Sequence, residues 1–180
     1  MSLKEFYESI AGVREELWSD KGKEHDYINS YYDKLFSPLK DENIKILEIG
    51  IYKGQSTRLF REYFTNAEIY TIDNGGEGGG IFSIEGVNHY WLDGYSSNTL
   101  DLFKNDFFDF IIDDGPHTYD SQLYSVQHWY NKLKIGGRLI IEDVKGLDWC
   151  DGFKLIRKGN IYDFREHKNR FDDIIYEVIK

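Results

Sequence analysis

The sequence has little that would cross-link the chain, carry it into a membrane or bind it to a polyanion. It has a single cysteine, Cys150, so an internal disulfide is excluded, and its first residues lack the apolar core of a signal peptide. No apolar run approaches the roughly 18 residues that span a bilayer. Basic residues number 22 against 32 acidic ones, and the resulting net charge of -10 repels a phosphate backbone. These absences predict a cytoplasmic protein with no membrane and no nucleic acid among its partners.

The 180 residues are enough for one buried core and too few for two domains of ordinary size. We therefore predict one domain, with a helical segment over residues 1–40 packed on an α/β core over residues 41–180. Within the first segment, the pattern predicts helices over 3–17 and 25–36, a polar loop over 19–27 and a helix stop at Ser37-Pro38.

Short β-rich runs bounded by polar residues or glycine alternate with segments of helical spacing. The runs cover residues 44–50, 67–73, 107–114 and 137–144, and two further candidates near the end cover 161–164 and 173–179. Alternation of strand and helix predicts a mostly parallel, Rossmann-like sheet with helices on both faces, and the last two strands would extend one edge. The glycine cluster 75–80 predicts a mobile loop after the second strand.

The first chemical signal is a strand that ends at glycine and leads into a helix. Glu48 ends the strand, Gly50 lies in the turn and Gly54 opens the helix. Such a turn lets a ligand approach the backbone, although any α/β protein can have one, and the dinucleotide pattern GxGxxG is missing. Asp73 follows at the end of the next strand, where a carboxylate can accept hydrogen bonds from both hydroxyls of a ribose. Together these residues favour a nucleoside ligand over a solvated strand end.

Three acids come at the ends of two later strands. Asp114 ends one strand, and Glu142 with Asp143 ends the next. Neighbouring carboxylates repel one another, and a cation relieves the repulsion. Oxygen ligands without a cysteine and histidine cluster favour Mg²⁺, with Mn²⁺ or Ca²⁺ as alternatives. The alternative interpretation is that these acids are helix caps or solvated carboxylates.

His117 follows Asp114 by three residues, close enough for its imidazole to meet a substrate held by such a metal. A hydroxyl that attacks a methyl sulfonium benefits from a base, and histidine titrates in the useful range. A histidine that caps the following helix is the alternative. His117 and Asp114 are therefore the candidate catalytic residues.

These motifs, taken in order, resemble the metal-dependent class I O-methyltransferases of the macrolide-sugar type, the mycinamicin and macrocin group. The resemblance extends over SDKGKEHDYINSYYDKLF (19–36), LEIGIYKGQS (47–56), YTIDN (70–74), DFIIDDGPH (109–117), GGRLIIEDV (136–144), YDFR (162–165) and RFDDIIYEVI (170–179). It implies the family's seven-stranded fold and S-adenosylmethionine as the methyl donor. The order and spacing of the motifs agree over nearly the whole chain.

The resemblance also implies roles for individual residues. Asp114, Glu142 and Asp143 would hold the metal, and His117 would be the general base. The donor would contact Glu48, Gly50, Gly54, Ser56, Asp73, Asn74, Asp93 and Asp113. Leu92 replaces the glycine usual before Asp93, and Pro116 replaces the serine usual before the base. Lys21, His25 and Tyr27 match the first of these motifs, residues 19–36, which we call the leading motif. The sequence gives no role for these three residues.

The predicted function is methyl transfer to a hydroxyl of a small molecule, such as a sugar or a glycosylated metabolite. Two alternatives stay open, an S-adenosylmethionine-binding module without catalysis and a nicotinamide-dependent oxidoreductase. The sequence offers little material for a lid over the acceptor, which favours a homo-oligomer that covers the cleft.

Overall fold

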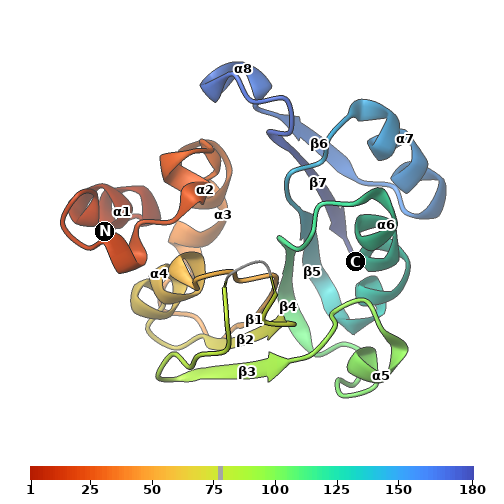
Figure 1. Cartoon of the computed structure of the whole chain (residues 1–180), viewed down its shortest axis with the longest axis horizontal. Coiled ribbons are helices and arrows are strands. Elements are labelled where there is room, and N and C mark those ends of the chain that lie inside the picture. Colours follow the sequence, from red (N-terminus) through yellow and green to blue (C-terminus); the bar gives the residue numbers. More distant parts are fainter. Residues whose placement is uncertain (77–78) are drawn as a thin grey trace.

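A seven-stranded sheet separates two layers of helices (Figure 1). The computed structural model describes residues 1–76 and 79–180. The strands are β1 (Lys45–Ile49), β2 (Glu68–Asp73), β3 (Val87–Trp91), β4 (Phe108–Asp113), β5 (Leu133–Ile141), β6 (Asn160–Asp163) and β7 (Ile174–Ile179). Their order across the sheet is β3-β2-β1-β4-β5-β7-β6.

The sheet is mixed. The pairs from β3 through β5 are all parallel, whereas β7 runs antiparallel to both β5 and β6. This confirms the predicted Rossmann-like fold with a mostly parallel sheet, and β6 and β7 do extend one edge. The sequence order is reversed at that edge, because β7 lies between β5 and β6.

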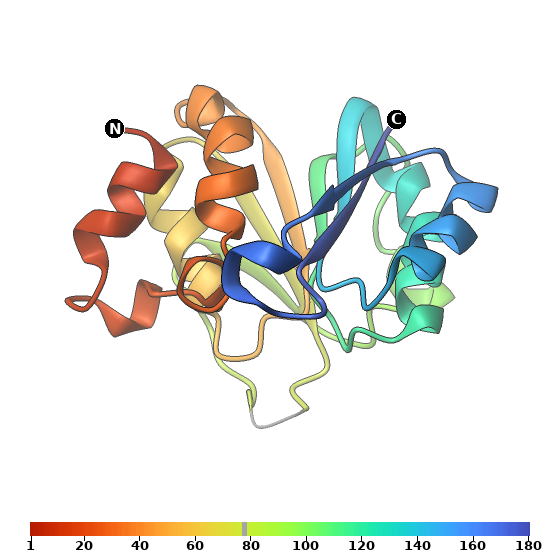
Figure 2. The ribbon, with the colours of Figure 1, turned by 90° about the horizontal axis from the view of Figure 1, so that it is seen from above.

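Both faces of the sheet are apolar because successive side chains of a strand point to opposite sides. Ile46 and Phe110 pack on one face, and Leu47 and Ile111 pack on the other. The first face is covered by α1 (Leu3–Ile10), η1 (Glu15–Leu17), α2 (Asp20–Lys23), η2 (Ile28–Tyr32), α3 (Asp33–Phe36), η3 (Ser37–Leu39) and α4 (Gln55–Tyr63). The second face is covered by α5 (Ser97–Leu100), α6 (Tyr119–His128), η4 (Trp129–Lys132) and α7 (Leu147–Ile156). Figure 2 shows the two layers on either side of the strands, with α8 (Arg165–Lys168) at the end of the β6–β7 hairpin.

The strand register brings the predicted site together. Asp113 of β4 lies between Ile49 of β1 and Ile141 of β5, so the residues that follow these three strands are neighbours. On the other side of β1, Ile72 of β2 lies beside Ile49. The order of strands reverses between β1 and β4, and in sheets of this kind ligands bind in the crevice at that point.

The structure corrects the sequence-based elements in five places. The predicted helix over 3–17 ends at Ile10, and a short 3-10 turn covers only Glu15–Leu17. The polar segment 19–27 is not a simple loop, because α2 forms within it and its residues Lys21, His25 and Tyr27 are buried. The helix over 25–36 begins as a π-helical turn over Ile28–Tyr32. Strand β3 was not predicted from the sequence, and β5 begins four residues earlier than expected.

The predicted glycine loop 75–80 includes residues 77 and 78, which lie outside the described residues, and Gly76 and Gly79 on either side are in turns.

Among the described residues, no helix has both the length and the apolar character needed to cross a membrane.

Candidate functional site

A cleft of about 510 Å³ opens at the carboxyl ends of β1, β2 and β4. Of the residues predicted from the sequence, the cleft is lined by Gly50, Ser56, Asp73, Asn74, Asp93, Asp114 and His117. Its volume lies in the range of small-molecule sites, and its position is the topological switch point of the sheet. The cleft therefore has the place and size expected of a nucleoside site.

The turn after β1 is closely packed. Gly50 has a φ of +81°, and a Cβ built on it would lie 2.1 Å from the main-chain oxygen of Asp114. The N–H of Asp114 donates to the carbonyl of Ile49 at 2.8 Å. The sequence predicted that this glycine lets a ligand approach the backbone. The structure shows that the group approaching Gly50 most closely is the main chain after β4.

Glu48 is buried beneath this turn and does not line the cleft. Its two carboxylate oxygens accept hydrogen bonds from Ser56 at 2.6 Å and Thr57 at 2.5 Å. Both donors lie at the start of α4, whose N-cap residue is Gly54. Glu48 and Gly54 thus hold the strand-to-helix connection, while Ser56 also reaches the cleft wall.

The carboxylate of Asp73 lies at the cleft and is fixed by backbone donors. The N–H groups of Ile51 and Gly75 donate to its two oxygens at 2.8 and 2.7 Å. Asn74 and Asp93 also line the cleft. Asp113 lies behind the wall, where it accepts a hydrogen bond at 2.6 Å from the hydroxyl of Tyr95, a cleft-lining residue that was not predicted. The role of Asp73 as the ribose acid stays a prediction.

A second group of side chains is here called the acidic centre. It consists of Asp114 and His117, which line the cleft, and Asp143, which lies beside them and is not a lining residue. Each of the three offers one ligand atom, and these atoms all lie within 4.8 Å of one another. The Nε2 atom of His117 lies 3.6 Å from Asp114 and 3.7 Å from Asp143. His117 and Asp143 both have positive φ angles, +49° and +52°. Left-handed backbone at two residues of one group is the kind of strain found at functional sites.

Glu142, the third predicted metal ligand, has different partners. One of its oxygens accepts a hydrogen bond from Lys21 and the other from Tyr32. Burial raises the pKa of Glu142 to about 7, Lys21 opposes this shift and Asp143 adds to it. The structure thus brings Asp114 and Asp143 together with His117, and it brings Glu142 together with Lys21.

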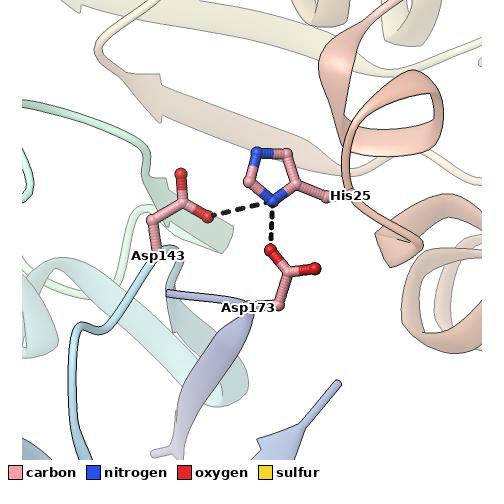
Figure 3. A group of neighbouring side chains, drawn as sticks. All are labelled: His25, Asp143 and Asp173. Carbon is pink, nitrogen blue, oxygen red and sulfur yellow. Dashed lines mark hydrogen bonds and ion pairs between the residues drawn. The ribbon is translucent and has the colours of Figure 1, made fainter. Parts of the chain in front are cut away.

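Residues before the first strand contact the acids of the site, and these contacts were not predicted from the sequence. The Tyr27 hydroxyl donates to Oδ1 of Asp143 at 2.8 Å. The Nδ1 atom of His25 lies 2.6 Å from Asp173, at the start of β7, and 3.6 Å from Asp143 (Figure 3). The pKa of Tyr27 is raised by burial and by Asp143, which keeps its hydroxyl a donor. The leading motif was the only signal of these contacts, since the partners lie more than 110 positions away in the sequence.

Comparison with known proteins identifies the fold and the family. A family model described as a methyltransferase domain matches residues 47–144, more than half of the chain. The tetracenomycin derivative 3'-O-methyltransferase of Streptomyces olivaceus is 26% identical over 149 residues, which are 75% of this chain and 36% of that protein. The demethylmacrocin O-methyltransferase of Streptomyces fradiae is 26% identical over 142 residues, 68% of this chain and 33% of that protein. The chain thus spans about a third of the length of these two relatives.

Solved structures agree on the architecture. The MycE methyltransferase from the mycinamycin biosynthetic pathway, in complex with Mg, SAH and mycinamycin VI, matches with a TM-score of 0.72 and 18% identity. That match covers 99% of this chain and 54% of MycE. A putative S-adenosylmethionine-dependent methyltransferase from Methanococcus maripaludis matches with a TM-score of 0.64 and 9% identity, over 99% of this chain and 93% of that one. The resemblance to the mycinamicin and macrocin group is therefore confirmed, and the chain belongs to the methyltransferase domain family.

Proposed function

We propose that this protein transfers the methyl group of S-adenosylmethionine to a hydroxyl of a small molecule. The observation that carries the proposal is the acidic centre, because Asp114 and His117 line a cleft in the position of a nucleoside site and Asp143 lies beside them. The family match supports methyl transfer in preference to nicotinamide-dependent oxidation.

The cleft suits the donor. The carboxylate of Asp73, at the end of β2, is placed to accept ribose hydroxyls through Oδ1, which accepts only the N–H of Gly75. Its Oδ2 already accepts the N–H groups of Ile51 and Tyr52. Gly50 and Ser56 line the side that leads into α4, where we place the methionine end of the donor. Asp93 and Asn74 line the cleft on the β2 and β3 side, where we place the adenosine.

The acidic centre suits a hard divalent cation such as Mg²⁺, because the carboxylates of Asp114 and Asp143 converge there. A cation bound by Asp114 and Asp143 would lower the pKa of the acceptor hydroxyl and fix its oxygen. Glu142 stays a candidate ligand by resemblance, although its oxygens are held by Lys21 and Tyr32 in this structure.

His117 is placed to act as the base. Its side chain is 30% exposed, and its Nε2 atom faces Asp114 and Asp143. In the proposed reaction the hydroxyl oxygen attacks the methyl carbon, the carbon–sulfur bond breaks, and its electron pair stays on the sulfur of S-adenosylhomocysteine. The hydroxyl proton passes to Nε2, where the two carboxylates stabilise the imidazolium.

The acceptor class follows from the relatives. One is named for methylation of a rhamnosyl group on tetracenomycin, and MycE was solved with mycinamycin VI. We therefore propose a sugar or a glycosylated metabolite as the acceptor. A homo-oligomer that covers the cleft remains part of this proposal.

The test combines donor binding with turnover. Calorimetry should show S-adenosylhomocysteine binding to the wild type, to His117→Gln and to Asp114→Asn. Turnover on a panel of glycosides and polyols, followed by S-adenosylhomocysteine release, should fall about 100-fold or more in both variants. His128→Gln is the matched control, since His128 lies on the exposed end of α6.

Three outcomes separate the possibilities. Undiminished turnover in His117→Gln and Asp114→Asn would refute the proposed mechanism. Donor binding without turnover on any acceptor would favour a module that binds the donor without catalysis. Stabilisation by NAD and not by S-adenosylhomocysteine in a thermal-shift assay would favour an oxidoreductase.

A further inference from the structure

Lys21 is an unusual lysine, because its side chain is only 1% exposed. Lysine is almost never fully buried unless it is paired. Its ammonium donates hydrogen bonds to Asp114 and Glu142 and lies 3.6 Å from Glu48. These carboxylates come from the ends of three different strands, β1, β4 and β5, whereas Lys21 comes from the segment before the sheet.

The local fold drives this side chain inward. Helix α2 is only four residues long, and the Ser19 hydroxyl accepts a hydrogen bond from the N–H of Lys21 at its start. The Tyr7 hydroxyl donates to the Ser19 carbonyl at 2.8 Å, and the ring of Tyr7 packs so closely on Gly22 that a Cβ there would lie 2.4 Å from it. Helix α1 therefore fixes α2 with Lys21 pointing to the strand ends.

Lys21 is also the main source of positive charge for these acids. Within residues 1–76 and 79–180, it is the one lysine or arginine that forms an ion pair with Glu48, Asp114 or Glu142. Three carboxylates therefore share one ammonium, which is their counter-charge in this structure.

The ammonium also orients Asp114. Lys21 bonds to Oδ2, and the other oxygen, Oδ1, is the atom that faces His117 at 3.6 Å. Glu142 is oriented in the same way, between Lys21 and Tyr32. One cation thus fixes two of the acids that follow neighbouring strands.

We propose that Lys21 is a positioning residue that acts as the built-in cation of this site, holding Asp114 and Glu142 in place before any metal binds. Removing one member of a buried ion pair leaves the remaining charges uncompensated, which is strongly destabilising. This part of the proposal depends only on the contacts of Lys21. Its consequence for metal binding rests on the proposed function.

The test is a double-mutant cycle in thermal unfolding. Lys21→Met keeps the unbranched stem of the side chain and removes the ammonium group, and we expect the Tm to fall by on the order of 10 °C. Adding Glu142→Gln to this variant removes one uncompensated acid, so at least half of the loss should return. Lys23→Met is the control, because Lys23 is exposed in the same helix and lies over the ring of Trp18; its Tm should stay within about 3 °C of the wild type.

Lys21→Met with a Tm equal to that of Lys23→Met would overturn the proposal, as would a double variant no more stable than Lys21→Met. If Lys21→Met does not fold, the double variant still decides, because the proposal requires it to fold.

A second readout separates positioning by charge from simple packing. The same unfolding series is repeated with Mn²⁺, and we expect Mn²⁺ to raise the Tm of Lys21→Met at least twice as much as that of the wild type. The reason is that the metal becomes the remaining cation near Asp114. Equal shifts in both proteins would overturn the charge role of Lys21. If Mn²⁺ shifts neither protein, the proposed metal site fails, while the cycle without metal still decides the role of Lys21.

Discussion

Replacing Gly50 with alanine should disturb the site through the backbone and not through a lost side chain. Gly50 follows β1, and its N–H donates to the carbonyl of Ile72 on β2 at 2.9 Å. On its other side the main chain of Asp114 is so close that a Cβ would lie 2.1 Å from its oxygen and 2.6 Å from its carbonyl carbon. Because hydrogen bonds hold the turn on both sides, the new methyl group can be accommodated only by displacing Asp114.

The size of the effect follows from two contributions. An alanine at a φ of +81° costs about 1 kcal/mol in the left-handed region after the gain from a less flexible unfolded chain. Forcing a methyl group into a packed backbone contact costs about 1–3 kcal/mol more. Gly136 isolates the first contribution, because it has a φ of +82° and a Cβ there would meet nothing within 4 Å. We therefore expect Gly136→Ala to lose about 1 kcal/mol and Gly50→Ala about 2–4 kcal/mol.

Urea unfolding followed by circular dichroism measures both variants under the same conditions. Calorimetry with S-adenosylhomocysteine adds a functional readout, because Gly50 and Asp114 both line the cleft and Gly136 does not. We expect donor affinity to fall only in Gly50→Ala. Equal losses of unfolding free energy in the two variants would refute the reasoning, since the contact with Asp114 would then contribute nothing.

Three further predictions concern contacts around the cleft and the sheet. Tyr27→Phe removes the hydroxyl that donates to Asp143, so the dissociation constant of Mn²⁺ measured by calorimetry should rise about tenfold; an unchanged constant would count against the metal site. Trp129→Phe removes the indole N–H that donates to the Gly94 carbonyl at 2.9 Å, and urea unfolding should show a loss of about 1–2 kcal/mol. Burial alone would raise the pKa of Glu177, but hydrogen bonds from four side chains hold it below its usual range. Its contribution to stability is therefore present above the unfolded-state pKa of about 4.3 and is lost as the pH falls through the folded value, so Glu177→Gln should make urea midpoints between pH 3 and 6 less dependent on pH. A slope as steep as that of the wild type would contradict this assignment.

The sheet and its acidic edge could be predicted because their signals are local. Apolar runs mark β1, β2, β4 and β5, and parallel strands bring the residues after them to one edge, so Asp73 and Asp114 were expected near one cleft. Strand β3 escaped prediction because its sequence, Val-Asn-His-Tyr-Trp, lacks the alternation of a half-buried strand. The interior position of β7 could not be read from chain order either.

The contacts of the leading segment could not be predicted from periodicity. A stretch such as Ser-Asp-Lys-Gly-Lys-Glu-His-Asp reads as solvated, because charged residues are mostly exposed. The burial of Lys21 and His25 depends on partners at Asp114 and Asp173, which only the folded chain brings near. Lys21 and Glu142 are also far apart in the sequence, so the sequence predicts Glu142 as a metal ligand and gives no sign of its contact with Lys21.

The residues around Asp143 are far apart in the sequence, and this affects how the protein folds during synthesis. Tyr27 leaves the ribosome before Asp143, and Asp143 leaves it before Asp173, yet all three contact or lie near His25. Contacts of such wide sequence separation form slowly. During synthesis the charged residues of the segment before β1 therefore stay in water until β5 and β7 have been made. A variant without residues 1–40 would lack Lys21, and the ion pairs that Lys21 forms with Glu48, Asp114 and Glu142 would be absent from it.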